Sequence, residues 1–125
     1  MKKTLVDSSA WIETLRPGGN PQVSERVARL LSLGDACWCD MVRLELWRGV
    51  KGREERSVLQ DLDTNLVCLE TPGTVWKSAV QLMRKAQSNG LNVPPPDVII
   101  VSVARHHKVN IEHSDRHIEE LLKLV

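Results

Sequence analysis

The chain contains no tyrosine and no phenylalanine, and its four tryptophans are Trp11, Trp38, Trp47 and Trp76. Proteins that bind single-stranded nucleic acid by stacking need several exposed aromatic side chains, so this composition argues against such a platform. The chain also lacks an excess of charge of one sign. It has 17 Lys and Arg residues and 16 Asp and Glu residues, which gives a formal net charge of +1. Any contact with nucleic acid must therefore depend on a local patch of positive charge.

Long apolar segments are absent as well. No apolar run of the sequence is long enough to span a bilayer. The basic start Met1-Lys2-Lys3 is followed by an apolar stretch that stops at Asp7, which is too short for a signal peptide. We therefore expect a cytoplasmic protein without membrane contact.

Cysteine is scarce, with only Cys37, Cys39 and Cys68 in the chain. An odd number of cysteines without a secretion signal argues for reduced thiols rather than a disulfide framework. Zinc sites need four ligands at wider spacings, and no second pair accompanies Cys37 and Cys39. We expect three buried and unreactive thiols.

What the sequence does contain is a regular alternation of short apolar strands and helical patterns. Its 125 residues fit one domain with one core, and we expect residues 1–125 to form it. The expected strands are residues 4–6, 36–39, 66–69 and 109–111. The expected helices are residues 8–15, 23–33, 41–48, 53–62, 72–89, 97–104 and 116–124, with Asp40 and Thr71 as capping residues. Because no hairpin turn joins two strands, the pattern predicts a three-layer α/β/α sandwich with a small parallel sheet.

Four carboxylates stand where such a fold binds its ligands. Asp7 follows the first strand, Asp115 follows the last, and Asp97 heads an apolar helix after three prolines. Glu45 lies among apolar residues in a helix, one turn after the second strand. In parallel α/β folds the carboxyl ends of strands and the adjacent helix starts face the ligand crevice. We therefore expect Asp7, Glu45, Asp97 and Asp115 to converge.

Converging carboxylates have a definite chemical use. Like charges raise one another's pKa values, and a divalent cation removes this problem. Hard carboxylate oxygens suit Mg²⁺ or Mn²⁺, which can orient water for in-line attack on a phosphodiester. Each acid also has an ordinary interpretation: Asp7 and Asp97 as helix caps, Asp115 as a turn residue, and Glu45 as a solvated helix residue. The pattern of residues leaves both interpretations open.

Four segments resemble the motifs of PIN domains, and within that group those of the toxin ribonucleases of VapBC-type toxin–antitoxin pairs. They are LVDSSAWI (residues 5–12), VRLELWRG (42–49), DVIIVSVA (97–104), and Ser114-Asp115 with Ile118. They are similar, in this order, to the opening strand with its Asp and Ser, the helix with its Glu, and the third and last acidic motifs of the family. The likeness covers nearly the whole chain, and the order and spacing are more specific than any single motif.

This resemblance implies a metal-dependent endoribonuclease that a cognate antitoxin inhibits and that forms homodimers. Under it, Asp7, Glu45, Asp97 and Asp115 are the catalytic, metal-binding acids, with Mg²⁺ or Mn²⁺ as the cofactor, and Ser9 supports them. The sequence departs from the family at His113, where Thr is usual, and at His117, where an acid is common. We interpret both histidines as non-ligands. Family members also often continue beyond the final helix into another short strand, which this sequence does not.

Positive charge near the acids could serve an RNA substrate or an antitoxin. Arg43, Arg48 and Arg116 are the candidates for these contacts. Glu54 and Glu55 dilute the basic run after Glu45, so a solvated face is the alternative interpretation. Trp11 and Trp47 would be suitable interface anchors if they are partly exposed.

Rival functions make different demands on the sequence. An aspartyl-phosphate phosphatase needs a second Asp two residues after the first, where this chain has Ser9. A receiver domain needs paired acids after its first strand and a central phosphorylatable Asp, which we do not find. The remaining alternative is a PIN-like module that binds RNA or protein without cutting, and calorimetric titration with Mg²⁺ or Mn²⁺ would distinguish it from the enzyme.

Overall fold

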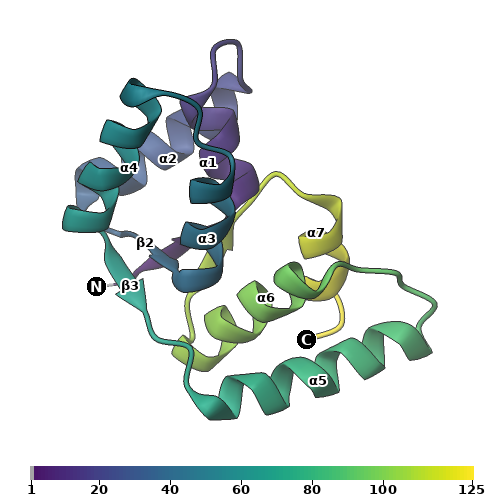
Figure 1. The fold of residues 1–125 in the computed structure, drawn as a ribbon. Helices are drawn as coiled ribbons and strands as arrows, with labels where there is room; N and C mark the ends of the chain where they lie inside the picture. Colours follow the sequence, from purple (N-terminus) through teal and green to yellow (C-terminus); the bar gives the residue numbers. More distant parts are fainter. Residues whose placement is uncertain (1) are drawn as a thin grey trace.

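The computed structural model describes residues 2–125, and in this part of the chain seven helices enclose a four-stranded parallel sheet (Figure 1). The strands are β1 (Thr4–Val6), β2 (Ala36–Cys39), β3 (Val67–Leu69) and β4 (Asn110–Glu112). The helices are α1 (Ser8–Leu15), α2 (Pro21–Leu33), α3 (Asp40–Arg48), α4 (Arg53–Asn65), α5 (Gly73–Ser88), α6 (Pro95–His107) and α7 (Arg116–Leu122). The predicted three-layer α/β/α architecture is confirmed.

The order of the strands places the ends of β1 and β4 next to each other. The sheet runs β3-β2-β1-β4, and every neighbouring pair is parallel. Leu5 of β1 pairs with Cys37 on one side and with Ile111 on the other. The chain thus adds strands first on one side of β1 and finally on the other. Such a switch in direction leaves a crevice at the carboxyl ends of the strands.

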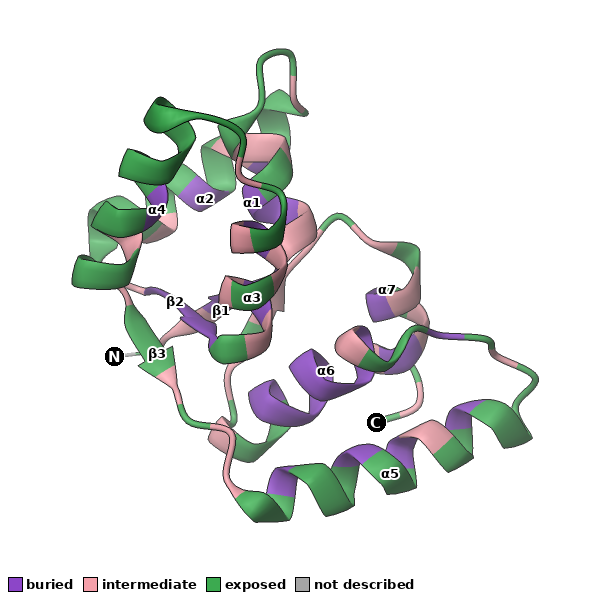
Figure 2. Ribbon diagram, in the orientation of Figure 1, coloured by how far each residue is buried: buried purple, intermediate pink, exposed green. Residues whose placement is uncertain are grey.

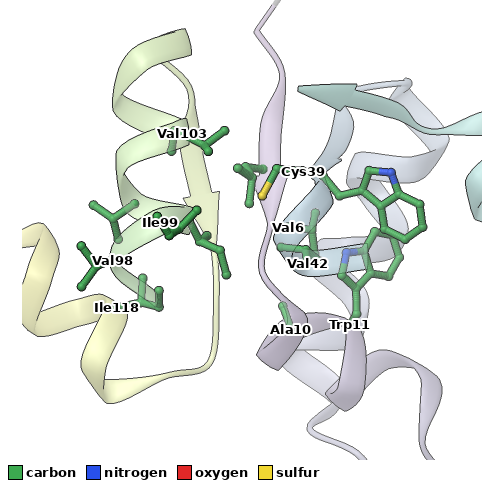
Figure 3. Close-up of a cluster of buried hydrophobic side chains, with 14 of the residues drawn as sticks. Val6, Ala10, Trp11, Cys39, Val42, Val98, Ile99, Val103 and Ile118 are labelled. Atoms are coloured by element: carbon green, nitrogen blue, oxygen red, sulfur yellow. The ribbon is translucent and has the colours of Figure 1, made fainter. Parts of the chain in front are cut away.

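Helix α6 is the buried centre of one helical layer. Its residues from Asp97 to Ala104 are all buried, and it packs against α5, α7 and α3 (Figure 2). Figure 3 shows side chains of α6, such as Val98 and Val103, gathered in the core with Val6 and Val42. A helix that is apolar on all sides is stable only when other elements cover it all round, as here.

Two helices begin at prolines, earlier than the sequence pattern suggested. Helix α2 starts at Pro21 rather than at residue 23, because the Asn20 side chain accepts the first backbone N–H groups. Helix α6 starts at Pro95, so Asp97 is its third residue and not its cap. Proline is tolerated in the first helical turn because its missing N–H group would have no partner there.

The two other predicted caps are also displaced by one residue. Asp40 is the first residue of α3 and bonds with Arg43 instead of capping, while Cys39 occupies the cap position. Pro72 occupies the cap position of α5, so Thr71 lies outside the helix.

Burial corrects two expectations about side chains. Cys37 and Cys39 are buried as predicted, and burial raises their pKa values to about 11 and about 12, but Cys68 on β3 is exposed. Trp11 is only 1% exposed and packs edge-on against Trp38, so it cannot anchor an interface. None of the helices among residues 2–125 has the length and apolar character needed to cross a membrane.

Candidate functional site

Asp7 lies at the end of β1 and caps helix α1. Its side chain is almost fully buried, with 1% of the residue exposed. Carboxylate atom Oδ2 accepts the Ser9 backbone N–H at 3.1 Å and the Ser9 hydroxyl at 2.6 Å. The other oxygen, Oδ1, is buried and has no hydrogen-bond partner among residues 2–125. Asp7 therefore has one satisfied oxygen and one free one.

Asp115 follows β4 and caps helix α7. Its Oδ1 accepts the backbone N–H groups of His117 at 2.6 Å and Ile118 at 3.2 Å. Two bonds hold this segment beside Asp7: the Asp7 N–H donates to the Glu112 carbonyl at 2.9 Å, and the Ser114 N–H donates to the Ser9 hydroxyl at 2.9 Å. Ser9 thus connects the two loops.

Asp97 enters the site from the first turn of α6. It is 7% exposed, and its carboxylate makes no hydrogen bond within residues 2–125. Its pKa is raised to about 7, mainly by burial and then by the negative charges of Asp115, Asp7 and Glu45, in that order of importance. A carboxylate in this position is kept charged only with difficulty.

Glu45 comes from helix α3 and is half-buried. The Ser8 hydroxyl donates to its Oε1 at 2.9 Å. Burial raises the pKa of Glu45, and Asp7 and Asp115 also raise it by charge repulsion. The sequence pattern places Ser8 at the start of a helix but does not reveal this contact with Glu45. The signal available was that Ser8 and Ser9 are adjacent in the first turn of α1, so that each can serve a different acid.

The mutual charge effects place the four acids in one neighbourhood. The pKa of Asp7 is raised mainly by burial and also by Asp115, and Asp97 responds to all three other acids. The donor set consists of carboxylate oxygens, which suit Mg²⁺ or Mn²⁺, and the unpartnered Asp7 Oδ1 is available as a ligand. Within residues 2–125 no three His, Cys, Asp or Glu side chains already stand close enough to hold an ion. The residues fit a metal by chemistry, and binding would require the carboxylates to draw closer.

The two histidines near Asp115 differ in their contacts with α7 and its loop. His113 Nδ1 accepts the Asp115 backbone N–H at 3.3 Å, and its Nε2 lies 3.2 Å from a carboxylate oxygen of Glu119. His117 Nδ1 lies 3.8 Å from Glu120. The His113 contacts hold the loop, whereas His117 Nδ1 is buried without a hydrogen-bond partner among residues 2–125. That both histidines are non-ligands stays a prediction.

The three candidate arginines differ in how freely they can contact a phosphate. Arg43 is held by Asp40 and Asp63 at 2.9 and 2.7 Å. Arg116 is exposed and lies 3.8 Å from Glu120. Arg48 is exposed, and its charge lowers the pKa of Glu45, so it stands nearer to the acids than a purely solvated residue would. Arg48 is therefore the best placed of the three.

A groove of about 360 Å³ opens beside Glu45. Helices α1, α3 and α4 line it, mainly with apolar side chains. Three of these are well exposed, Ile12 at 48%, Leu15 at 44% and Val58 at 40%. We call this the α1–α3–α4 groove.

Comparison with known proteins identifies the family. The PIN domain family model matches residues 4–124. The chain is 30% identical over 104 residues to ribonuclease VapC21 of Mycobacterium tuberculosis, covering 81% of this chain and 75% of the relative. It is 27% identical over 124 residues to ribonuclease VapC11 of the same organism, covering 96% and 92%.

Solved structures agree on the fold. The crystal structure of FitAcB from Neisseria gonorrhoeae matches with a TM-score of 0.71 at 19% identity, over 96% of this chain and 93% of that one. DNA-bound VapBC from Salmonella typhimurium matches with a TM-score of 0.65 at 18% identity, over 90% and 98%. Because the family model covers nearly all of the sequence, this chain belongs to the PIN domain family.

Proposed function

We propose that this protein is a metal-dependent endoribonuclease of the VapC type, the toxin of a toxin–antitoxin pair. In this proposal Asp7, Glu45, Asp97 and Asp115 hold Mg²⁺ or Mn²⁺, and residues 1–125 act as a single PIN-like domain in the cytoplasm. Relatives named as ribonucleases support the activity, and solved neighbours named as VapBC complexes support the antitoxin partner.

The observation that carries the proposal is the state of Asp97. A buried carboxylate without hydrogen bonds is costly, and three further acids nearby increase that cost. Among residues 2–125 no N–H or O–H group donates a hydrogen bond to this carboxylate to offset that cost. A divalent cation among the four acids would offset the cost of burying these charges, because its own charge stabilises every carboxylate at once.

The chain's own residues prepare the site for RNA. Ser9 fixes Asp7 and the Asp115 loop, while Ser8 fixes Glu45. Arg48 offers an exposed positive charge for a phosphate of the RNA backbone. When bound, the metal ions supply a water of lowered pKa and positive charge beside the scissile phosphodiester.

Inhibition would come from occupation of the α1–α3–α4 groove. We propose that an apolar segment of the antitoxin lies there, because Ile12 and Leu15 are exposed and Glu45 is on the groove's wall. A segment in this position would restrict access of RNA to the acids. The antitoxin would then bind more weakly to an Ile12→Asp variant.

Homodimers are part of the same proposal. Helix α5 exposes Trp76 at 51% and Val80 at 60%, and residues four apart lie on the same helical face. We propose that this face meets a second copy of the chain. Sedimentation should then show a dimer that Trp76→Glu converts to a monomer.

The test of the enzyme is RNA cleavage by purified protein with Mg²⁺ or Mn²⁺, with and without a chelator. We expect cleavage that requires the metal and is lost in Asp7→Asn, which keeps a cap acceptor for Ser9. Asp61→Asn, on the exposed side of α4, is the matched control and should cleave normally. Full activity in Asp7→Asn would sink the proposal. Absence of both cleavage and metal binding by calorimetry would favour the non-catalytic binding module.

A further inference from the structure

A second groove, of about 590 Å³, runs along the outer edge of strand β4. Among residues 2–125, β4 is the last strand on this side of the sheet, and the groove lies between α2 on one face and α6 and α7 on the other. Its apolar lining includes Leu30, Val101, Ile111 and Leu122. We call this the β4-edge groove.

The backbone of β4 is available for pairing in this groove. In a parallel ladder, a residue directs both its N–H and its C=O to one neighbouring strand, and the next residue directs them to the other side. Glu112 accepts the Asp7 N–H, so it faces β1. Ile111 therefore directs its N–H and C=O toward the groove. An edge strand of this kind is a template for another extended segment.

The charge of the β4-edge groove is positive. Arg26, Arg29 and Arg105 stand around it, against the single acid Glu112. Arg26 is paired with Glu112 at 3.0 Å, whereas Arg29 and Arg105 are exposed and form no ion pair with any residue in the range 2–125. Two guanidinium groups thus remain for an incoming negative charge.

We propose that the β4-edge groove binds an extended acidic segment of another protein, which adds to the sheet as a strand beside β4. Main-chain hydrogen bonds to Ile111 would give this segment its direction, and the apolar lining on each face of the sheet would receive its apolar side chains. Successive side chains of an added strand point to opposite faces, so a carboxylate that faces α2 would meet Arg29 and one that faces α6 would meet Arg105. The apolar lining favours a peptide over a nucleic acid, because sugar and phosphate groups would cover apolar surface without burying apolar atoms of their own.

The probe is a short synthetic peptide in which pairs of valines alternate with pairs of glutamates, so that each face of the added strand carries both residue types. It is added to the isotope-labelled protein and followed by NMR. We expect shifts confined to β4, α2 and the end of α6, and slower hydrogen exchange at the Ile111 amide. Reversing both free charges in Arg29→Glu/Arg105→Glu should weaken binding about tenfold or more, since two exposed ion pairs are lost. Arg53→Glu/Arg56→Glu makes the same charge change on α4, away from the groove, and should bind normally.

Three results would overturn the proposal. One is the absence of shifts in β4 at saturating peptide. Another is equal binding of the same peptide with lysine in place of glutamate, because charge would then select nothing. The third is a uridine oligonucleotide that shifts the groove residues while the valine–glutamate peptide leaves Ile111 exchange unchanged, which would make the groove a nucleic-acid site. None of these readouts depends on RNA cleavage, so the proposal stands or falls separately from the enzyme activity.

Discussion

The loops after β1 and β4 and the first turn of α6 supply acids to the same site in different ways. Asp7 and Asp115 each accept two hydrogen bonds and cap a helix. Asp97 caps nothing and accepts no hydrogen bond within residues 2–125, although it is buried. The first two acids stabilise the fold as well as shaping the site, whereas Asp97 only adds electrostatic cost.

This difference indicates which of the acids gives the clearest evidence of a functional rather than a structural role. A helix cap contributes to stability whether or not a metal binds, so Asp7 and Asp115 alone would be consistent with a purely structural role. A buried, unsupported carboxylate beside three others lowers stability and needs another explanation. Asp97 is therefore the residue at which function and fold can be separated by experiment.

The largest expected effect is on cleavage by Asp97→Asn. If the acids hold a metal, loss of one carboxylate should reduce RNA cleavage on the order of 100-fold or more, because several kcal/mol of charge stabilisation are lost. The melting temperature should hold or rise, since a buried charge is removed. Cleavage assays with Mn²⁺ and thermal unfolding of the same samples give both values. A collapse in melting temperature would instead make Asp97 a structural residue like the caps.

The second prediction concerns stability against pH in a chelating buffer. The pKa of Asp97 is raised from 3.8 to about 7 in the folded protein, so the folded state binds more protons than the unfolded state between these values. The free energy of unfolding should therefore fall as pH rises from about 4 to about 7. Asp97→Asn should flatten this slope, with Asp7 and Glu45 accounting for what remains. Urea titrations across this pH range measure the free energy of unfolding of both proteins. An unchanged pH slope in Asp97→Asn would refute the assignment to Asp97.

The third prediction tests the support of a capping acid. Ser9→Ala removes the hydroxyl that donates to Asp7 and accepts from Ser114, so Mn²⁺ affinity should fall roughly 10–100-fold, as for other residues that orient metal ligands. Ser9→Thr keeps the hydroxyl and should restore most of the affinity. Ser88→Ala, on the exposed end of α5, is the control. Calorimetric titration measures the Mn²⁺ affinity of each variant. An affinity of Ser9→Ala equal to that of the unchanged protein would exclude the supporting role of Ser9.

The smallest expected effect is on the cap itself. Asp115→Ala should lower the free energy of unfolding by about 1 kcal/mol, because the first turn of α7 loses its acceptor. Asp115→Asn retains an oxygen for the same N–H groups and should lose much less. Urea unfolding at neutral pH separates the two variants. Equal stability of all three proteins would mean that Asp115 contributes nothing as a cap, and the contrast with Asp97 would disappear.

Sequence reasoning succeeded where local patterns decide and failed where burial decides. The alternation of strands and helices predicted the parallel sheet, since hairpin turns are missing between the strands. The local pattern does not place helix starts at Pro21 and Pro95, because the turn residues before Pro21 and the run of three prolines are typical of loops, although proline also suits a first helical turn. The exposure of Cys68 and the burial of Trp11 depend on which elements cover them, and that is not written in the neighbouring residues.

The sequence by itself determined that Asp7 and Asp115 would each follow a strand and open a helix, because strand patterns and capping chemistry are local. Only the tertiary structure decided that these residues, from opposite ends of the chain, would lie side by side, through the pairing of β1 with β4. It also decided that Asp97 would face them, because the packing of α6 against its neighbours sets the direction of its first turn. Convergence of charge is a property of packing, and packing depends on contacts between residues far apart in sequence.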